Sequence, residues 1–329
     1  MPKRRPGAGP ASAGSRAGFG FGVSAYLMWG VLPLYLSLTR QAGAVEVIAH
    51  RVIWSALLCL GIIAAGGQWR ALRAVARSGR AMGALSLAAI LLTGNWLVFV
   101  WAIFNGQLVD AALGYFINPL VSVLLGVVFL GERLRVAQWA AVATAAGAVV
   151  VMTLSLGAFP WVALALAISF GLYGYIEKRV GGRVSAVVSL TVETLLVLPL
   201  AAAYALWLAA AGAGTFPALG WGHSLALAGL GVATAAPLLA FNAAARRLPL
   251  SVLGFVQYLC PVMHFITGLL FFHEPMSAGR WFGFAAVWVA LAILSADGVW
   301  HARRAGAPRA RPASPAEPAR RPRPGLSGS

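Results

Sequence analysis

The second long apolar segment of the chain begins with polar residues that could do chemistry, Glu46, His50 and Arg51. On a helix, Glu46 and His50 share a face at i, i+4 spacing, and Arg51 lies beside them. An arginine near the centre of a membrane helix costs about 2.5–3.5 kcal/mol on insertion scales, so it faces the protein interior and needs a partner. The cluster predicts a centre that binds substrate or relays a proton through His50. The alternative is a structural ion pair, with His50 as a hydrogen bond between helices.

An acidic partner for Arg51 is expected in another apolar segment. Glu193 lies well inside such a segment, whereas Asp110 lies at the start of one. Opposite charges in an apolar medium attract strongly, and each lowers the cost of burying the other. We therefore expect Arg51 and Glu193 to form the charged centre, with Asp110 as the alternative partner.

Two further segments carry a stripe of polar side chains that includes a proline. The stripes are Tyr115, Asn118, Pro119 and Ser122 in one segment, and Gln257, Pro261 and His264 with the adjacent Tyr258 in the other. A proline inside a helix frees a backbone carbonyl, which in a membrane must be satisfied by protein or water. Helices broken at equivalent positions of two repeats are typical of transport sites. We therefore expect Pro119 and Pro261 to break their helices beside a binding site.

Aromatic and amide side chains deep in the apolar segments could form the wall of that site. A buried indole needs a partner for its N–H group or a cavity to face. The predicted wall consists of Tyr26, Trp29, Trp54, Asn95, Trp96, Tyr115, Asn118, Gln257 and Tyr258. For each of these residues alone, ordinary helix packing is the alternative role.

These residues must be positioned by membrane-spanning helices. Hydrophobic residues make up 60% of the 329 positions, charged residues 10%, and the mean hydropathy is +0.82. About 20 apolar residues in a helix cross the hydrocarbon core of a bilayer. The sequence predicts ten such spans, at 18–38, 44–65, 82–104, 108–130, 136–156, 160–178, 185–209, 222–245, 250–272 and 279–300.

The net charge of +17 follows from topology and does not indicate a nucleic-acid partner. Basic residues concentrate in the two tails and in every second gap between spans, whereas the intervening gaps hold only Arg40 and Arg280. This is the positive-inside pattern for ten spans with both termini in the cytoplasm. The tails at 1–17 and 301–329 are rich in Pro, Arg, Ala and Gly, and we expect them to be disordered.

An internal repeat divides the spans into two halves. Pro119, Gly126 and Glu132 recur at identical spacing as Pro261, Gly268 and Glu274, each set closing one long apolar segment. A half with five spans has an odd number of crossings, so a second copy must insert upside down. The sequence therefore predicts an all-α integral membrane protein with two inverted five-helix repeats, at 18–156 and 160–300.

Signatures of other chemistry are missing from the sequence. There is no glycine-rich phosphate loop with lysine, no zinc-protease pair of histidines and no nucleophile elbow. The two cysteines, Cys59 and Cys260, lie in separate apolar spans and predict neither a disulfide framework nor a metal site. We therefore expect no enzyme activity, no cofactor and no metal.

Several stretches resemble the RarD-type branch of the EamA-domain drug/metabolite transporters. They include EVIAHRVIWS at 46–55, GNWLVFVWA at 94–102, LGYFINPLV at 113–121 and LSVLGFVQYLCP at 250–261. The resemblance implies a ten-helix inverted-repeat permease of the bacterial inner membrane, whose central cavity opens alternately to each side. Asp110 stands where this branch would have glutamate and Ala112 where serine is usual, which weakens ligand roles for these two positions.

The sequence thus predicts a secondary-active permease that moves a small organic metabolite or drug-like molecule by alternating access, with proton coupling through His50 or Glu193. The alternative is a membrane assembly or sensor protein that transports nothing, in which the polar residues only pack. The expected partners are a small-molecule substrate and membrane lipid, and the protein is expected to be a monomer or a homodimer.

Overall fold

The computed structural model of the chain describes residues 11–130, 133–156, 159–180, 184–245, 247–248, 252 and 256–306. Within these residues the chain forms helices joined by short turns, with no strand. The predicted all-α class is therefore confirmed. The inner ends of both predicted tails are helical, because α1 begins at Ala11 and α12 continues to Gly306, while 1–10 and 307–329 lie outside the described residues.

The helices follow one another in the order expected from the apolar segments. They are α1 (Ala11–Ser37), η1 (Arg40–Ala42), α2 (Gly43–Ala65), α3 (Trp69–Ala76), α4 (Gly79–Phe104), α5 (Leu108–Leu130), α6 (Val136–Leu156), α7 (Trp161–Val180), α8 (Ala186–Ala210), α9 (Gly220–Ala245), α11 (Leu259–Ile266), η2 (Thr267–Phe271) and α12 (Ala278–Gly306).

Eight of the described helices are long and apolar enough to cross a membrane. The predicted spans at 160–178 and 250–272 coincide with two shorter apolar helices, Trp161–Glu177 and Leu259–Phe271. A multi-pass membrane protein is therefore established, whereas the count of ten crossings stays a prediction.

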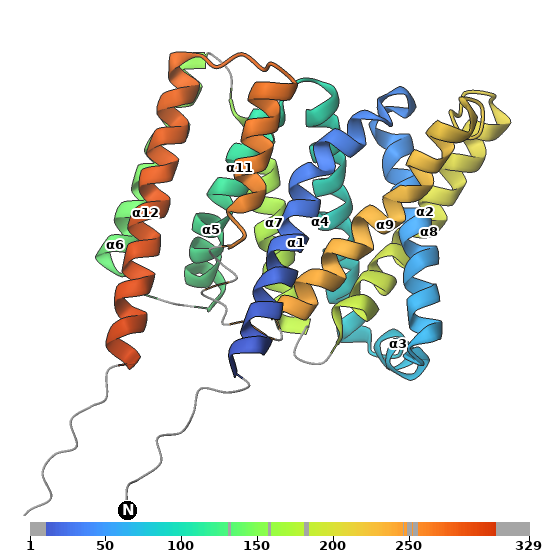
Figure 1. Ribbon diagram of the computed structural model, residues 1–329, viewed down its shortest axis with the longest axis horizontal. Helices are drawn as coiled ribbons and strands as arrows, with labels where there is room; N and C mark the ends of the chain where they lie inside the picture. Colours follow the sequence, from blue (N-terminus) through green and yellow to red (C-terminus); the bar gives the residue numbers. More distant parts are fainter. Residues whose placement is uncertain are drawn as a thin grey trace, which may run out of the picture.

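The long helices stand side by side in one bundle (Figure 1). In this bundle α6 packs along α12, α5 along α7, and α2 along both α8 and α9, while α1 contacts α9 and α4 contacts α7. Neighbours α2 and α8 are antiparallel. Glu46 near the start of α2 bonds Thr215 beyond the end of α8, and Gln68 beyond the end of α2 bonds Ser185 before the start of α8.

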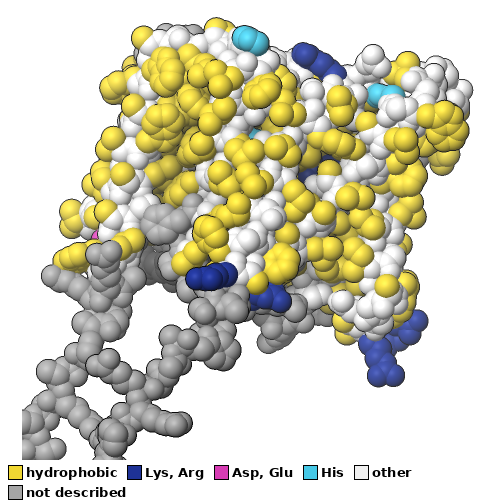
Figure 2. Space-filling model, viewed as in Figure 1, with side chains coloured by type: hydrophobic (Ala, Val, Ile, Leu, Met, Phe, Trp, Pro, Cys, Tyr) yellow, Lys and Arg dark blue, Asp and Glu magenta, His cyan; other side chains and the backbone are white. Residues whose placement is uncertain are grey.

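The outer surface of the bundle is apolar. Leu154, Leu200 and Val128 are 78%, 74% and 72% exposed, far more than leucine and valine usually are in a soluble protein. In Figure 2, yellow apolar side chains cover the middle of the visible face, and dark blue Lys and Arg side chains lie mainly at its lower edge. A bilayer would meet the apolar middle and leave the charged ends in water.

Glycines allow the closest approaches between helices. A Cβ atom at Gly114 of α5 would lie 2.5 Å from the carbonyl oxygen of Ala163 in α7, and one at Gly231 of α9 would lie 2.6 Å from that of Trp54 in α2. Membrane helices gain much of their association energy from such close van der Waals contact. These two glycines therefore fix the α5–α7 and α2–α9 interfaces.

Two expectations about helix irregularity are corrected. Helix α5 continues through Pro119 from Leu108 to Leu130. Pro261 is the third residue of α11, where a missing N–H group leaves no helix bond unmade, and the irregular turn is the π-helix Thr267–Phe271 instead. The short helix α3 was not predicted from the sequence. Its Leu72 and Val75 are buried at i, i+3 spacing.

Candidate functional site

Arg51 lies inside the bundle, where α2, α4 and α9 meet. It is 4% exposed, and its Nε donates to Thr234 Oγ1 at 3.0 Å. The guanidinium carbon lies 4.1 Å from the ring centroid of Trp96, a cation–π contact. Its Nη1 is buried and has no hydrogen-bond partner among the described residues. The two contacts orient the guanidinium and leave part of its donor capacity unused.

The same stretch of α2 holds three more buried polar atoms without a partner. They are Nδ1 of His50, Nε1 of Trp54 and Oγ of Ser55. The rings of His50 and Trp54 both approach Phe216, with centroids 4.9 and 6.3 Å away. Buried polar groups are nearly always hydrogen-bonded, so a run of four such residues marks a place built to meet something other than this chain. We call His50, Arg51, Trp54, Ser55, Trp96 and Thr234 the Arg51 cluster.

Glu193 does not join this cluster. Its carboxyl oxygens accept from Tyr173 and from Ser189, both at 3.5 Å, and Ser189 also donates to Glu177 at 2.5 Å. Within the described residues, the ion pairs do not include one between Arg51 and Glu193. The expected Arg51–Glu193 pair is therefore replaced by two separate polar centres. The alternative partner, Asp110, bonds Arg280 at 3.0 Å.

The predicted amide and tyrosine residues on α4 and α5 bind the neighbouring α7. Asn95 donates to the carbonyl of Leu166 at 3.2 Å and to Ser169 at 2.9 Å, and it accepts from Tyr115 at 3.3 Å. Asn118 donates to the carbonyl of Ala167 at 3.1 Å. These side chains are already satisfied within the protein, so they hold α4 and α5 onto α7.

The remaining predicted wall residues form a second aromatic group at α1, α9 and α11. Tyr26 and Trp29 pack on Phe241, and the carbonyl of Trp29 lies 3.0 Å from Nε2 of His264. Tyr258 lines a shallow apolar groove of about 350 Å³, and Gln257 beside it is half-buried. The predicted wall is therefore divided among three groups: the Arg51 cluster, the residues bonded at α7, and this second aromatic group.

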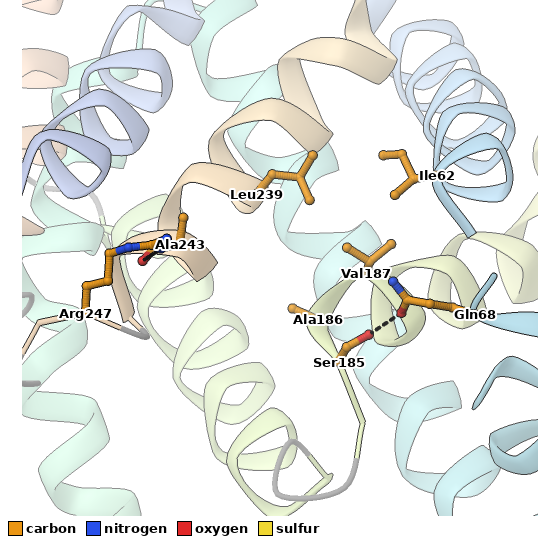
Figure 3. A pocket seen from close by; sticks show the side chains of 8 residues that line it. All are labelled: Ile62, Gln68, Ser185, Ala186, Val187, Leu239, Ala243 and Arg247. Atoms are coloured by element: carbon orange, nitrogen blue, oxygen red, sulfur yellow. Dashed lines mark hydrogen bonds between the residues drawn. The ribbon is translucent and has the colours of Figure 1, made fainter. Parts of the chain in front are cut away.

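A cavity of about 600 Å³ opens at one end of the bundle (Figure 3). It lies where the end of α2, the start of α8 and the end of α9 meet. Figure 3 shows its lining side chains, with the hydrogen bond of 3.1 Å between Ser185 and Gln68: Ile62, Gln68, Ser185, Ala186, Val187, Leu239, Ala243 and Arg247. Its volume suits a small organic molecule.

One apolar layer separates this cavity from Arg51. The layer consists of Cys59, Leu92, Leu190, Trp96, Tyr173 and Leu238. Along α2, Arg51, Ser55, Cys59 and Ile62 share one face, so the cavity, the layer and the cluster follow one another over about 16 Å of helix. Tyr173 connects the layer to Glu193.

Glu274 has a structural role at the opposite end of the bundle. Its carboxylate accepts from the backbone N–H groups of Leu108 at 2.7 Å and Val109 at 2.8 Å, and so caps the start of α5. Burial raises the pKa of the Glu274 carboxyl, and the two backbone hydrogen bonds offset part of that rise. Its counterpart in the repeat, Glu132, lies outside the described residues.

Sequence reasoning missed several of the contacting residues. Thr234 of the Arg51 cluster accepts from Arg51, Phe216 contacts the ring of His50, and Glu177 shares Ser189 with Glu193. Thr234 offered only one weak signal, a hydroxyl inside an apolar span. Within the described part of the chain, no group of three or more His, Cys, Asp or Glu side chains could hold a metal ion.

An apolar helical bundle that buries an arginine and opens a cavity at one end has the construction of a membrane transporter. Similar known proteins belong to the same class. The EamA-like transporter family matches residues 16–154. The protein RarD of Streptomyces exfoliatus is 46% identical over 311 residues, covering 93% of this chain and 98% of that protein. An "uncharacterized transporter" of Vibrio cholerae is 42% identical over 290 residues, covering 88% and 95%.

The chain belongs to the RarD-type branch of the EamA-like transporter family. It is a multi-pass membrane transporter of bacterial type, and the resemblance seen in its sequence is confirmed. A solved crystal structure shares the fold with a TM-score of 0.54 at 19% identity, covering 87% of this chain and 98% of that one.

Proposed function

We propose that the protein is a secondary-active transporter that moves a small organic metabolite or drug-like molecule by alternating access. The observation that carries this proposal is the Arg51 cluster, with buried polar atoms that no part of the described chain satisfies. A cavity of about 600 Å³ lies on the same helix face beyond one apolar layer. Opening that layer on one side, and the opposite end of the bundle on the other, would expose Arg51 to each side in turn.

The packing of the helices supports two inverted halves with ten crossings. The two halves can be matched helix by helix: α1 with α7, α2 with α8, α4 with α9, α5 with α11 and α6 with α12. Exchanging the matched helices maps each main interface onto an interface that is also present. The α1–α9 interface becomes α7–α4, α5–α7 becomes α11–α1, and α2–α8, α5–α11 and α6–α12 become themselves. A two-fold axis in the membrane plane produces such a pattern.

The positions of the basic residues support an orientation. Arg70, Arg73 and Arg77 on or beside α3 and Arg247 after α9 belong to the cavity end, whereas Arg40 and Arg280 belong to the other. By the positive-inside rule the cavity then opens to the cytoplasm, where both termini would also lie. The protein would work in the inner membrane as a monomer or homodimer.

Glu193 is the better placed of the two candidate coupling residues. Glu177 and Tyr173 of α7 face it, and Glu177 and Glu193 both contact Ser189. Two carboxylates that share one partner repel each other, so a proton bound between them is favoured. His50 lies instead beside Arg51, whose positive charge opposes a second one.

Transport by the purified full-length chain in lipid vesicles tests this function. Vesicles loaded with a broad mixture of metabolites and drug-like compounds should exchange at least one of them faster than protein-free vesicles. A pH gradient should drive its accumulation, and Glu193→Gln should remove that dependence on pH while leaving downhill exchange. If folded protein moved no member of the mixture, the role of a membrane assembly or sensor protein would be favoured instead.

A further inference from the structure

The positive charge of Arg51 has no acidic partner within the described part of the chain. Of the eight acidic residues, six are described, and each has another contact. Glu46 accepts from Thr215, Asp110 pairs with Arg280, Asp297 pairs with Arg135, and Glu274 caps α5. Glu177 and Glu193 share Ser189, one apolar layer away. Within the described residues, the buried cation contacts the Thr234 hydroxyl and the Trp96 ring.

The unsatisfied atoms beside Arg51 include three hydrogen-bond donors. Arg51 Nη1, Trp54 Nε1 and Ser55 Oγ each carry a hydrogen that no acceptor meets, and Arg51 and Ser55 are 4% and 0% exposed. An oxyanion with several lone pairs is the group that such a set of donors binds best, and a guanidinium fork binds a carboxylate through two parallel hydrogen bonds.

The frame of the site is aromatic. The ring of Trp96 lies under the guanidinium at 4.1 Å, and the rings of His50 and Trp54 converge on Phe216. Flat rings are good partners for a planar body, because stacked and edge-on contacts add to the area that is buried.

We propose that the transported substrates are organic anions, and that the carboxylate of a planar or aromatic acid binds Arg51, Trp54 and Ser55. This inference rests on the proposed transport function and names its substrate class. The ligand reaches the cluster from the cavity when the layer around Cys59 and Leu190 opens. In the bilayer the negative charge of the ligand and the positive charge of Arg51 each reduce the cost of burying the other.

Three compounds of equal shape test the charge preference. Benzoate is an anion, benzamide is neutral and benzamidine is a cation at neutral pH. Binding to the purified full chain in detergent is measured by equilibrium dialysis with labelled benzoate and by displacement with the other two. Acetate, acetamide and acetamidine repeat the comparison for a smaller body. The affinity for benzoate should be at least about tenfold higher than the affinity for benzamide, since one charge-assisted hydrogen bond is worth at least that factor.

Two variants locate the binding. Arg51→Gln should lose the preference for benzoate over benzamide, and Trp54→Phe, which removes the N–H donor and keeps an aromatic ring, should weaken benzoate binding several-fold. Arg40→Gln is the matched control, because Arg40 is exposed and bonds the carbonyl of Phe104 at the end of the bundle. It should bind benzoate as the wild type does.

Several results would overturn the inference. They are equal displacement by benzamide or benzamidine, benzoate binding that survives Arg51→Gln, and failure of both carboxylates to bind folded protein. In each case the vesicle measurement decides about transport separately. Exchange of neutral or cationic compounds alone would leave the transport function standing and remove only the anionic substrate class.

Discussion

Arg51→Gln is expected to reduce substrate exchange in vesicles at least about 30-fold, because truncating one partner of a buried charged contact costs about 2–5 kcal/mol. The variant keeps a polar side chain near Thr234 but loses both the charge and the contact with Trp96. Arg51→Lys should recover only part of the rate. Lysine supplies the charge without the planar fork that binds a carboxylate through two bonds.

The control for this result is Arg40→Gln, together with the melting temperature of each variant. A buried structural cation, if removed, would change stability rather than transport. Arg51→Gln is expected to melt close to the wild-type temperature and to transport poorly. A variant that transports normally, or one that is inactive only because it is unfolded, would assign Arg51 to structure.

Gly114→Leu is expected to destabilise the bundle strongly. Even a Cβ atom at this position would lie 2.5 Å from the backbone of Ala163, and the backbone cannot rotate away as a side chain can. Overpacking of this kind costs about 1–3 kcal/mol, and a backbone clash lies at the upper end of that range. We expect a lower melting temperature in detergent and a lower yield from the membrane.

Gly94→Leu is the matched comparison. Gly94 also lies in a long apolar helix, but a Cβ atom added there meets no heavy atom within 4 Å. Replacing glycine in a helix gains up to about 1 kcal/mol of helix propensity. This variant should therefore melt at or slightly above the wild-type temperature. Equal losses in both variants would show that glycine flexibility, not close α5–α7 packing, matters at position 114.

The spanning segments could be predicted from the sequence because the bilayer imposes them. Hydropathy and length located most of the spanning helices to within a few residues, as in α6, predicted at 136–156 and observed at Val136–Leu156. The burial of Arg51 and Glu193 could be expected as well, since lipid excludes both. These properties depend on each segment alone and on its solvent.

Contacts between segments could not be predicted in the same way. Which face of α2 meets α9 depends on close packing at Gly231, and this placed Thr234, not Glu193, beside Arg51. The repeated Pro, Gly and Glu were interpreted as the mark of a duplicated half, and the two prolines as breaks beside a binding site. In the structure, Gly268 lies against Val109 and Glu274 caps α5, so this copy of the repeat fastens two helices together. The spacing of these residues identified the repeat but did not predict that one copy holds two helices together.

Side-specific labelling of a cysteine at position 55 tests alternating access to the Arg51 cluster most directly. Ser55→Cys is made with Cys59→Ala and Cys260→Ala, and charged membrane-impermeant methanethiosulfonates are applied to right-side-out and to inverted membrane vesicles. Because Ser55 is buried one turn from Arg51, reaction requires an open aqueous path. If access to the Arg51 cluster alternates, the cysteine introduced by Ser55→Cys should react from both sides of the membrane, and faster with the anionic reagent than with the cationic one. Reaction from one side only, or from neither, would contradict it.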